Sequence, residues 1–197
     1  MKQELNKTYW DNRFLNCDTP WDLGYCSPPL KKYFDNLTNK ELEILVPGAG
    51  NAYEAEYLFN KGFKNVYVLD ISTEAIKLFT ERVRKFPKEQ IICQDFFAHK
   101  KQYDLIVEQT FFCALNPVLR SAYAMQVRNL LKPNGKLIGL MFNNTFEKAG
   151  PPFGGSKNEY EATFLPHFKN IKMTPCLDSI KPRLGNEIFV EISEKQF

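Results

Sequence analysis

The sequence lacks several features that mark specialised classes of protein. It holds only two histidines and five cysteines, and the cysteines form no C-x-x-C pair and no zinc-finger spacing. No segment approaches the ~18 consecutive apolar residues of a membrane span, and residues 1–7 are polar, unlike a secretory signal. The 26 basic residues barely exceed the 23 acidic ones, and a clustered basic face for nucleic acid is missing. We therefore expect a soluble, cytoplasmic protein with reduced thiols and with no metal, membrane or nucleic-acid partner.

What is present is the composition of an ordinary globular protein, with 44% hydrophobic and 25% charged residues among 197. A chain of this size buries roughly 70% of its unfolded surface on folding, which suffices for a core without disulfides. No repeat, linker or low-complexity segment divides it. We therefore expect a monomer with a single domain, in which residues 1–40 form an N-terminal helical cap or lid and residues 41–197 form the core.

Beyond the cap, short apolar runs alternate with helical patterns, as in a parallel sheet covered by helices on both faces. Ser72 is expected to cap one of these helices, and Asn116 with Pro117 to open another. The last two strand candidates are separated by a loop without a helix, which implies an antiparallel hairpin at the edge of the sheet. The expected fold is α/β, with a doubly wound, mostly parallel sheet of seven strands. The strand candidates are 42–47, 65–69, 90–93, 103–107, 136–142, 170–174 and 187–192.

Further helical patterns lie outside this alternation. In the N-terminal extension, one covers residues 5–15 and a second begins at the S-P-P sequence of residues 27–29. Later in the chain, Ser156 and Glu159 form a capping box ahead of residues 160–165. We expect short helices at these places, in addition to those that alternate with the strands.

The most informative segment is a strand that runs into Gly48 and Gly50 and then into a helix. Glycines at the carboxyl end of the first strand let the backbone approach a ligand, and open α/β sheets bind their ligands at this edge. Asp70 ends the next strand 22 residues after Gly48, the spacing at which an acidic side chain meets ribose hydroxyls in nucleotide-binding folds. A tight turn explains the glycines alone, but together with Asp70 they predict a nucleoside cofactor.

Tyr53 distinguishes between possible cofactors. The dinucleotide fingerprint has glycine or alanine at this position for close helix packing over a pyrophosphate, so the tyrosine disfavours an NAD-dependent oxidoreductase. S-adenosylmethionine has no pyrophosphate, and the terminal hairpin fits methyltransferases better than dehydrogenases. After the third strand, Asp95 offers a carboxylate to an adenine amino group, and Phe96 and Phe97 offer an aromatic face. Taken alone, Asp95 is better explained as a helix or turn cap.

Sequence blocks along nearly the whole chain carry a resemblance to a known family. They are T-P-W-D-L-G at 19–24, V-P-G-A-G at 46–50, L-D-I-S at 69–72, D-F-F at 95–97, T-F-F-C-A at 110–114, N-P at 116–117 with Arg120, and G-P-P-F at 150–153. With them the sequence resembles the thiopurine S-methyltransferase family, most closely its plant-type halide and thiol methyltransferases. The resemblance implies a class I, Rossmann-like methyltransferase fold and S-adenosyl-L-methionine as cofactor, with S-adenosyl-L-homocysteine as its product.

The resemblance also implies which residues bind this cofactor. The N-terminal tryptophans match family positions that contact it, and Phe14 stands where the plant branch has a third tryptophan. Gln109 departs from the halide and thiol branch, which has a tyrosine there, so the acceptor preference stays open at this point. The expected cofactor-binding residues are Trp10, Phe14, Trp21, Gly48, Gly50, Asp70, Asp95, Phe96 and Gln109.

The acceptor side is expected at aromatic residues and one arginine. Phe111, Phe112 and Phe153 are candidates for the wall of an apolar acceptor pocket, and ordinary core packing explains each of them equally well. By resemblance, Trp21 also matches a position that touches substrate, and Arg120 matches a substrate-orienting arginine of the thiopurine branch. A solvent-facing helix position is the other explanation of Arg120. An aromatic face such as Trp21 stabilises a sulfonium cation by about 0.5 to 2 kcal/mol.

The leading hypothesis is an S-adenosylmethionine-dependent methyltransferase that acts on a small soft nucleophile: a thiol, bisulfide, thiocyanate or a halide ion. Methyl transfer is an in-line displacement that needs no metal, and orientation and desolvation supply the acceleration when the acceptor is an anion. One alternative is a thiopurine or aryl-thiol S-methyltransferase, which Arg120 and the aromatic walls favour. A second is a non-catalytic S-adenosylmethionine-binding protein, which Gln109 favours.

Overall fold

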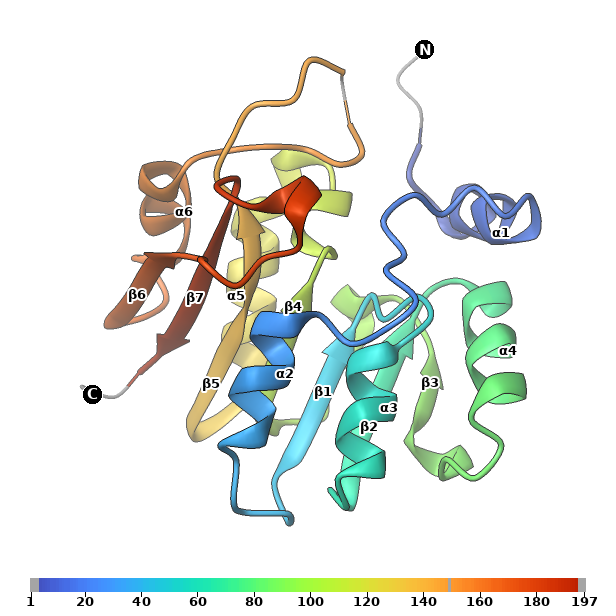
Figure 1. The fold of residues 1–197 in the computed structure, drawn as a ribbon. Coiled ribbons are helices and arrows are strands. Elements are labelled where there is room, and N and C mark those ends of the chain that lie inside the picture. The colour runs from blue at the N-terminus through green and yellow to red at the C-terminus, as the bar shows by residue number, and fades with distance from the viewer. Residues whose placement is uncertain (1–3, 149, 195–197) are drawn as a thin grey trace.

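The structure is a computed structural model that describes residues 4–148 and 150–194. Its strands are β1 (Glu43–Pro47), β2 (Asn65–Asp70), β3 (Ile91–Cys93), β4 (Tyr103–Gln109), β5 (Leu131–Phe142), β6 (Asn170–Pro175) and β7 (Glu187–Ser193). They form a seven-stranded sheet of order β3-β2-β1-β4-β5-β7-β6 (Figure 1). The first five strands are parallel, and β7 runs antiparallel between β5 and β6. The predicted α/β sheet with an antiparallel C-terminal hairpin is confirmed.

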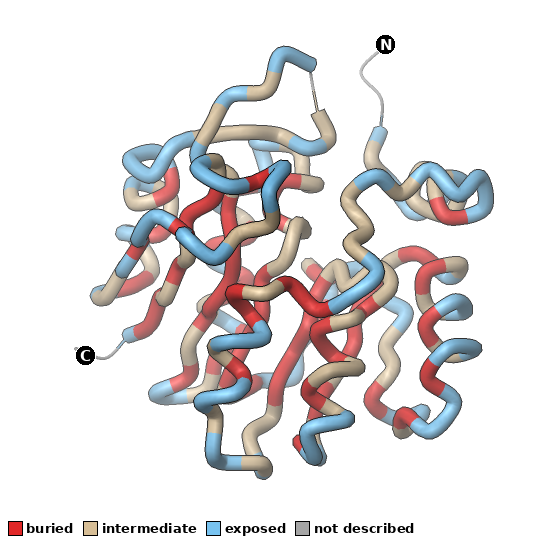
Figure 2. Tube along the Cα trace, viewed as in Figure 1, coloured by how far each residue is buried: buried red, intermediate tan, exposed pale blue. Residues whose placement is uncertain are grey.

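Helices cover both faces of this sheet, and α1 lies outside these two layers. The α-helices are α1 (Lys7–Leu15), α2 (Pro28–Asp35), α3 (Tyr53–Asn60), α4 (Thr73–Arg82), α5 (Arg120–Leu130) and α6 (Lys157–Phe164). Residues of α2, α3 and α4 pack with Ile44 and Val46 of β1 on one face, and residues of α5 and α6 pack with Leu45 on the other. Successive strand residues point to opposite faces, so the continuous apolar run of β1 serves two cores. Figure 2 shows buried residues concentrated in the strands and on the inner sides of the helices.

Capping side chains set where several helices begin. Ser72 caps α4 and Ser156 caps α6, each by accepting a hydrogen bond from a backbone N–H three residues further on, as predicted. Asn116 instead caps a short 3-10 turn, Pro117–Leu119, and α5 begins only after this turn. Among the helices of residues 4–148 and 150–194, none is long and apolar enough to cross a lipid bilayer.

The parallel strands end at one edge of the sheet, and α1 lies there. β1, β2 and β4 reach this edge at Pro47, Asp70 and Gln109. Figure 1 shows α1 above this edge, beside the start of α4 and away from both helical layers. The chain of residues 16–27 then crosses the edge before α2 enters its layer. This arrangement places the N-terminal extension directly over the loops that follow the strands.

Candidate active site

The loop after β1 adopts a backbone conformation that favours glycine. Gly48 and Gly50 have φ angles of 55° and 54°, and Ala52, just before α3, has a φ of 53°. A Cβ atom on Gly48 would lie 2.1 Å from a ring carbon of Phe111, so a side chain does not fit there. Glycine at position 48 therefore lets the Phe111 ring pack directly on the loop backbone, and the loop still lines the cavity at the carboxyl edge of the sheet, where open α/β sheets bind ligands.

Asp70 ends β2 and ties two loops together. Its Oδ2 accepts a hydrogen bond from the Gly50 N–H at 2.8 Å, and its Oδ1 accepts one from the Ser72 N–H at 2.8 Å. Burial raises the pKa of Asp70, and the backbone N–H groups of Ser72, Gly50 and Ile71 oppose this shift. A carboxylate offers about four lone-pair sites, so acceptor capacity remains for a hydroxyl of a ribose.

One cavity brings the predicted cofactor residues together. Its volume is about 710 Å³, within the usual range for sites that bind small molecules. The walls come from the N-terminal extension, the glycine loop, the loops after β2, β3 and β4, and the loop between β6 and β7. The predicted residues that line it are Trp10, Phe14, Trp21, Gly48, Gly50, Asp70, Asp95, Phe96, Gln109 and Phe111.

Aromatic side chains of the N-terminal extension cover the glycine loop. A Cβ atom on Gly50 would lie 3.6 Å from Cζ of Phe14 and 4.0 Å from Nε1 of Trp21. Trp10 packs edge to face on Trp21, with ring centroids 5.7 Å apart. The Arg13 guanidinium lies 4.7 Å from the centre of the Trp21 ring, in cation–π contact. These rings form the cover of the cavity above Gly50.

Asp95 both caps a turn and lines the cavity, so the capping explanation is confirmed and the carboxylate also lies where a ligand could reach it. Its Oδ1 accepts a hydrogen bond from the Phe97 N–H at 3.0 Å, at the start of the 3-10 turn Phe96–Ala98. Phe96 is buried and stacks on Tyr123, with ring centroids 5.4 Å apart. The carboxylate and the ring are therefore fixed side by side at the cavity wall.

Glu108 is a buried carboxylate that fixes the loop after β4. Its Oε1 accepts hydrogen bonds from the N–H groups of Phe111 and Phe112, both at 2.8 Å, and its Oε2 accepts one from the Tyr123 hydroxyl at 2.5 Å. Burial raises the pKa of Glu108 to about 7 in spite of these donors. Sequence reasoning does not identify this role, although a charged residue inside an apolar strand was a signal for it. The carboxylate holds the backbone that carries the Phe111 ring over the glycine loop.

Gln109 brings an unpartnered polar atom to the cavity. Its Oε1 is buried and, within the described ranges, has no hydrogen-bond partner. Its backbone carbonyl accepts a hydrogen bond from the hydroxyl of Thr110, which has a φ of 58°. A buried oxygen without a donor destabilises the folded state, so this position suits a ligand that brings an N–H or O–H group.

Arg183 also lines the cavity, and sequence reasoning misses it. Its Nη2 donates to the Trp21 carbonyl at 2.9 Å, and its Nη1 donates to Oε1 of Glu187 at 3.4 Å. The guanidinium carbon lies 5.6 Å from the centre of the Phe142 ring, and the residue is only 9% exposed. Nothing local in the sequence marks this arginine, because its position depends on how the C-terminal hairpin docks beside β5.

Three predicted acceptor-site residues lie outside the cavity walls. Arg120 forms an ion pair with Glu159, and its Nη2 donates to the Gly154 carbonyl at 2.7 Å. The arginine is buried against α6, so it occupies neither the cavity nor a solvent-facing position. Phe112 is 1% exposed and belongs to the core beneath α5 and α6. Phe153 is partly exposed and does not line the cavity.

The donors and acceptors of the cavity fit S-adenosylmethionine. Asp70 has free acceptor sites for ribose hydroxyls, Asp95 and Phe96 suit an adenine ring, and the Oε1 of Gln109 suits an ammonium group. The strand order with its antiparallel β7, together with a glycine loop and a carboxylate at the ends of the first two strands, defines the class I S-adenosylmethionine-dependent methyltransferases.

Solved structures share this fold. The glycopeptide N-methyltransferase MtfA complexed with S-adenosylmethionine matches with a TM-score of 0.67 and 12% identity, over 85% of this chain and 93% of that one. A TehB-like S-adenosylmethionine-dependent methyltransferase from Corynebacterium glutamicum matches with a TM-score of 0.66 and 14% identity, over 96% of this chain and 98% of that one. These similarities confirm the predicted methyltransferase fold.

Sequence relatives narrow the class to a family. The model of the thiopurine S-methyltransferase family matches residues 5–195. The probable thiol methyltransferase 2 of Arabidopsis thaliana is 33% identical over 184 residues, which cover 90% of this chain and 81% of the relative. Thiocyanate methyltransferase 1 of Brassica oleracea is 32% identical with the same coverage, and a thiopurine S-methyltransferase of Vibrio atlanticus is 23% identical over 98% of this chain and 96% of the relative. The chain belongs to the thiopurine S-methyltransferase family and is an S-adenosylmethionine-dependent S-methyltransferase.

Proposed function

We propose that this methyltransferase acts on a small, soft, anionic nucleophile: a thiolate, bisulfide, thiocyanate or a halide ion. The observation that carries the proposal is the buried guanidinium of Arg183, which lines the cavity beside apolar side chains. Phe142 lies against this guanidinium, and Cys113, Pro151 and Pro152 line the same cavity. The relatives named for thiol and thiocyanate methylation, at 33% and 32% identity, support the same class of acceptor.

Residues that line the same cavity would hold the cofactor beside this wall. S-adenosylmethionine, when bound, supplies a methyl group on a positively charged sulfur, and the acceptor displaces that sulfur in line. Asp70 would accept hydrogen bonds from the ribose, and Asp95 and Phe96 would hold the adenine. The Oε1 of Gln109 would accept a hydrogen bond from the ammonium group. The aromatic cover around Trp21 stabilises a nearby cation and keeps water from the site.

The acceptor is attracted and oriented from the opposite side. Arg183 offers N–H donors to an anion, and Glu187, 3.4 Å from the guanidinium, balances part of the positive charge. The Arg183–Glu187 pair carries little net charge, so Arg183 contributes mainly hydrogen-bond donors, which suits an anion of low charge. Trp21 connects the proposed cofactor side of the cavity with the proposed acceptor side, because its indole lies near Gly50 and its carbonyl accepts a hydrogen bond from Arg183. Apolar walls remove water from the anion, which raises its reactivity, and a fixed orientation supplies the remaining acceleration.

A parallel acceptor assay tests this proposal. Purified protein receives methyl-labelled S-adenosylmethionine with iodide, thiocyanate, bisulfide, an aryl thiol or a thiopurine, and volatile product is trapped separately. We expect label in the volatile products, and we expect Arg183→Met to raise the KM for thiocyanate about tenfold or more, the effect of losing one charged hydrogen bond. Arg183→Lys keeps the charge, so its KM for thiocyanate should lie between that of the wild type and that of Arg183→Met. Label in the aryl thiol or thiopurine alone would move the assignment to the thiopurine branch, and no transfer with cofactor bound would contradict the proposal.

The proposal includes a monomer that works in the cytoplasm, with a helical cap at residues 1–40 over a core at 41–197. All five cysteines are free thiols, which supports a reducing compartment. An acceptor and a cofactor that are both small molecules enter through one cavity, and the walls of that cavity come from one chain. Sedimentation of the purified protein at micromolar concentration measures the oligomeric state directly.

A further inference from the structure

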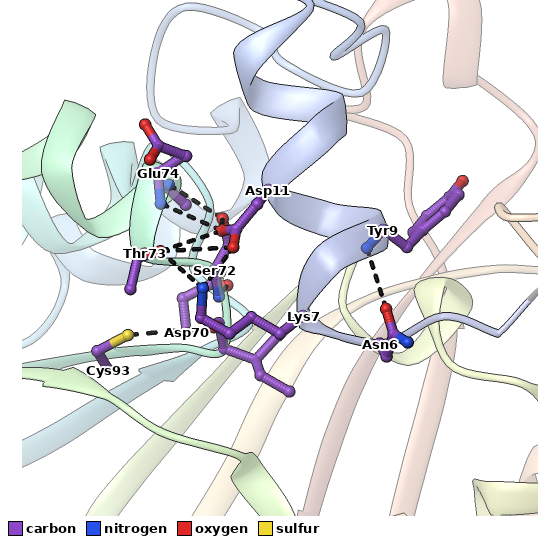
Figure 3. Close-up of polar contacts among 11 residues, drawn as sticks. Asn6, Lys7, Tyr9, Asp11, Asp70, Ser72, Thr73, Glu74 and Cys93 are labelled. Carbon is purple, nitrogen blue, oxygen red and sulfur yellow. Dashed lines mark hydrogen bonds and ion pairs between the residues drawn. The ribbon is translucent and has the colours of Figure 1, made fainter.

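One carboxylate, Asp11, fixes helix α1 to the body of the protein. Its Oδ1 accepts hydrogen bonds from the Ser72 hydroxyl at 2.7 Å and from the Glu74 N–H at 3.3 Å. The Thr73 hydroxyl lies 3.4 Å from both carboxylate oxygens. Lys7 pairs with Asp11 and donates to the Thr73 hydroxyl at 2.8 Å (Figure 3). The partners outside α1 are the N-cap residue and the first turn of α4, where the partial positive charge of a helix N-terminus favours a carboxylate.

Ser72 connects this contact to the cofactor site. Its N–H donates to Oδ1 of Asp70 at 2.8 Å, while its hydroxyl donates to Asp11 and accepts from the Ala75 N–H at 3.1 Å. The residue is fully buried. Asp70 in turn holds the glycine loop through the Gly50 N–H. A single buried serine therefore lies between the carboxylate of α1 and the carboxylate that receives the ribose.

Helix α1 also carries part of the cavity wall. Trp10 precedes Asp11, and Phe14 lies three residues after it, so the three side chains are fixed by the same short helix. Within the described residues, α1 makes its side-chain hydrogen bonds to the chain beyond residue 40 through Lys7 and Asp11. Hydrogen bonds of Lys7 and Ser72 lower the pKa of Asp11 against the effect of burial, which raises it, so the carboxylate is ionised at neutral pH.

We propose that Asp11 is a positioning residue that latches α1 over bound cofactor. When the latch is formed, Phe14 and Trp10 cover the glycine loop and Ser72 is held against Asp70. When it breaks, α1 lifts with both aromatic rings, and the cofactor cavity opens to solvent. The latch thereby sets how fast cofactor and product leave. This inference rests on the proposed placement of the ribose at Asp70.

The two tryptophans of the chain provide the probe for a test, because Trp10 and Trp21 both line the cavity. Intrinsic fluorescence in a stopped-flow instrument follows the release of S-adenosylhomocysteine after dilution or displacement. We expect Asp11→Ala to raise the dissociation rate about tenfold or more, the effect of losing a hydrogen bond to a charged group. Asp11→Asn keeps one acceptor for the Ser72 hydroxyl, so its dissociation rate should lie closer to that of the wild type. kcat per bound enzyme at saturating cofactor should change much less than the dissociation rate.

Asp18→Ala is the matched control. Asp18 lies in the same extension and pairs with Arg13 at 2.9 Å, but it neither contacts α4 nor lines the cavity. This variant should release the ligand at the wild-type rate. Hydrogen exchange adds a second measurement: bound S-adenosylhomocysteine should protect the amides of residues 7–15 in the wild type and in Asp18→Ala, and protect them much less in Asp11→Ala.

The outcomes separate the latch from the cofactor site itself. Asp70→Ala should weaken the equilibrium binding of S-adenosylhomocysteine. Asp11→Ala should still bind this ligand at saturating concentration but release it faster. If Asp11→Ala releases the ligand at the wild-type rate and protects residues 7–15 equally, the latch is wrong while the cofactor site stands. If Asp70→Ala binds as tightly as the wild type, the ribose placement is wrong and the latch loses its basis. Circular dichroism melting of each variant checks that the core remains folded.

Discussion

Glu108 is a buried carboxylate whose protonation state affects the site through the loop that it holds. It is fully buried at the end of β4, and its hydrogen bonds hold the N–H groups of Phe111 and Phe112. Burial disfavours the carboxylate, whereas the three donors favour it, and burial prevails, so the pKa rises to about 7. The loop that packs on Gly48 is therefore held by a group that titrates near neutral pH.

A stability measurement against pH tests this account of Glu108. Its pKa in the folded protein, about 7, lies above the usual value of 4.5, so between these values the folded state binds one more proton than the unfolded state. The contribution of Glu108 to stability is complete below pH 4.5 and is lost as the pH rises through 7. In Glu108→Gln, the amide oxygen still accepts from the two N–H groups and the titration disappears.

We expect the free energy of unfolding of the wild type, relative to that of Glu108→Gln, to fall by up to about 3 kcal/mol between pH 4.5 and pH 8. Urea unfolding of both proteins at several pH values gives this difference. Other buried carboxylates affect both proteins equally and cancel. Parallel stability curves for the two proteins would show that Glu108 does not titrate in this range.

At the scale of elements, Arg120 joins the start of α5 to α6 and to the loop before it. Its partners are Glu159 on α6 and the Gly154 carbonyl, and its guanidinium lies over the rings of Phe112 and Tyr160. The loop held in this way includes the proline pair 151–152 in the cavity wall. Arg120 thus affects the cavity wall only through the position of a loop.

This account predicts a particular pattern for Arg120→Met. The variant leaves the Gly154 carbonyl without its donor, which should lower the free energy of unfolding by about 1 to 3 kcal/mol. The Kd for S-adenosylhomocysteine should stay within about twofold of the wild type, and the KM for the acceptor should rise, because the loop at 151–152 loosens. Denaturant unfolding, fluorescence titration and initial rates measure the three quantities. Full stability combined with lost transfer would instead mean that Arg120 contacts the acceptor.

Local signals explain which elements the sequence predicts correctly. Apolar runs identify all seven strands, and Ser72 and Ser156 mark helix starts because a cap needs only residues three positions away. The strand expected at 136–142 begins earlier, at Leu131, because β4 pairs on both sides of an irregularity in β5 where Asn134 has a φ of 72°. Pairing between strands is a tertiary event that no local window contains.

The residues of the site also divide into those that local sequence signals predict and those that depend on tertiary packing. Gly48, Gly50 and Asp70 follow from strand ends, which the apolar pattern locates. Arg183 could not be predicted, because it enters the cavity only after the hairpin adds to β5. The neighbours Phe111 and Phe112 also could not be told apart, because the first ring points to the cavity and the second points into the core. Side-chain direction in an irregular loop depends on the packing around it, here on Glu108.

At the scale of the whole molecule, the cavity joins both ends of the chain. Arg183 donates to the Trp21 carbonyl across 162 positions, and Asp22 of the extension accepts a hydrogen bond from Asn51 of the glycine loop. Ser27, at the start of α2, donates its N–H to the buried carboxylate of Glu54 on α3 at 2.9 Å. The extension is thus tied to the first and last parts of the core, so a ligand in the cavity contacts elements that unfold together.

We therefore expect the chain to melt in one transition that bound ligand shifts as a whole. S-adenosylhomocysteine at 100 times its Kd adds about 2.7 kcal/mol to the free energy of unfolding. For a domain of this size, that gain raises Tm by roughly 5 to 10 °C. Asp70→Ala should lose this shift, because the proposed ribose acceptor and the support of the Gly50 N–H disappear together.

NAD is the matched control ligand, because it shares the adenosine but adds a pyrophosphate. Tyr53 opens α3 and lines the cavity, with the Arg82 guanidinium 4.3 Å from the centre of its ring, so the helix start is filled where a pyrophosphate would lie. NAD at the same concentration should leave Tm unchanged in differential scanning calorimetry. An equal shift with both ligands would mean that adenosine alone is recognised. Two separate transitions, with one that ignores the ligand, would mean that the extension and the core do not form one cooperative unit.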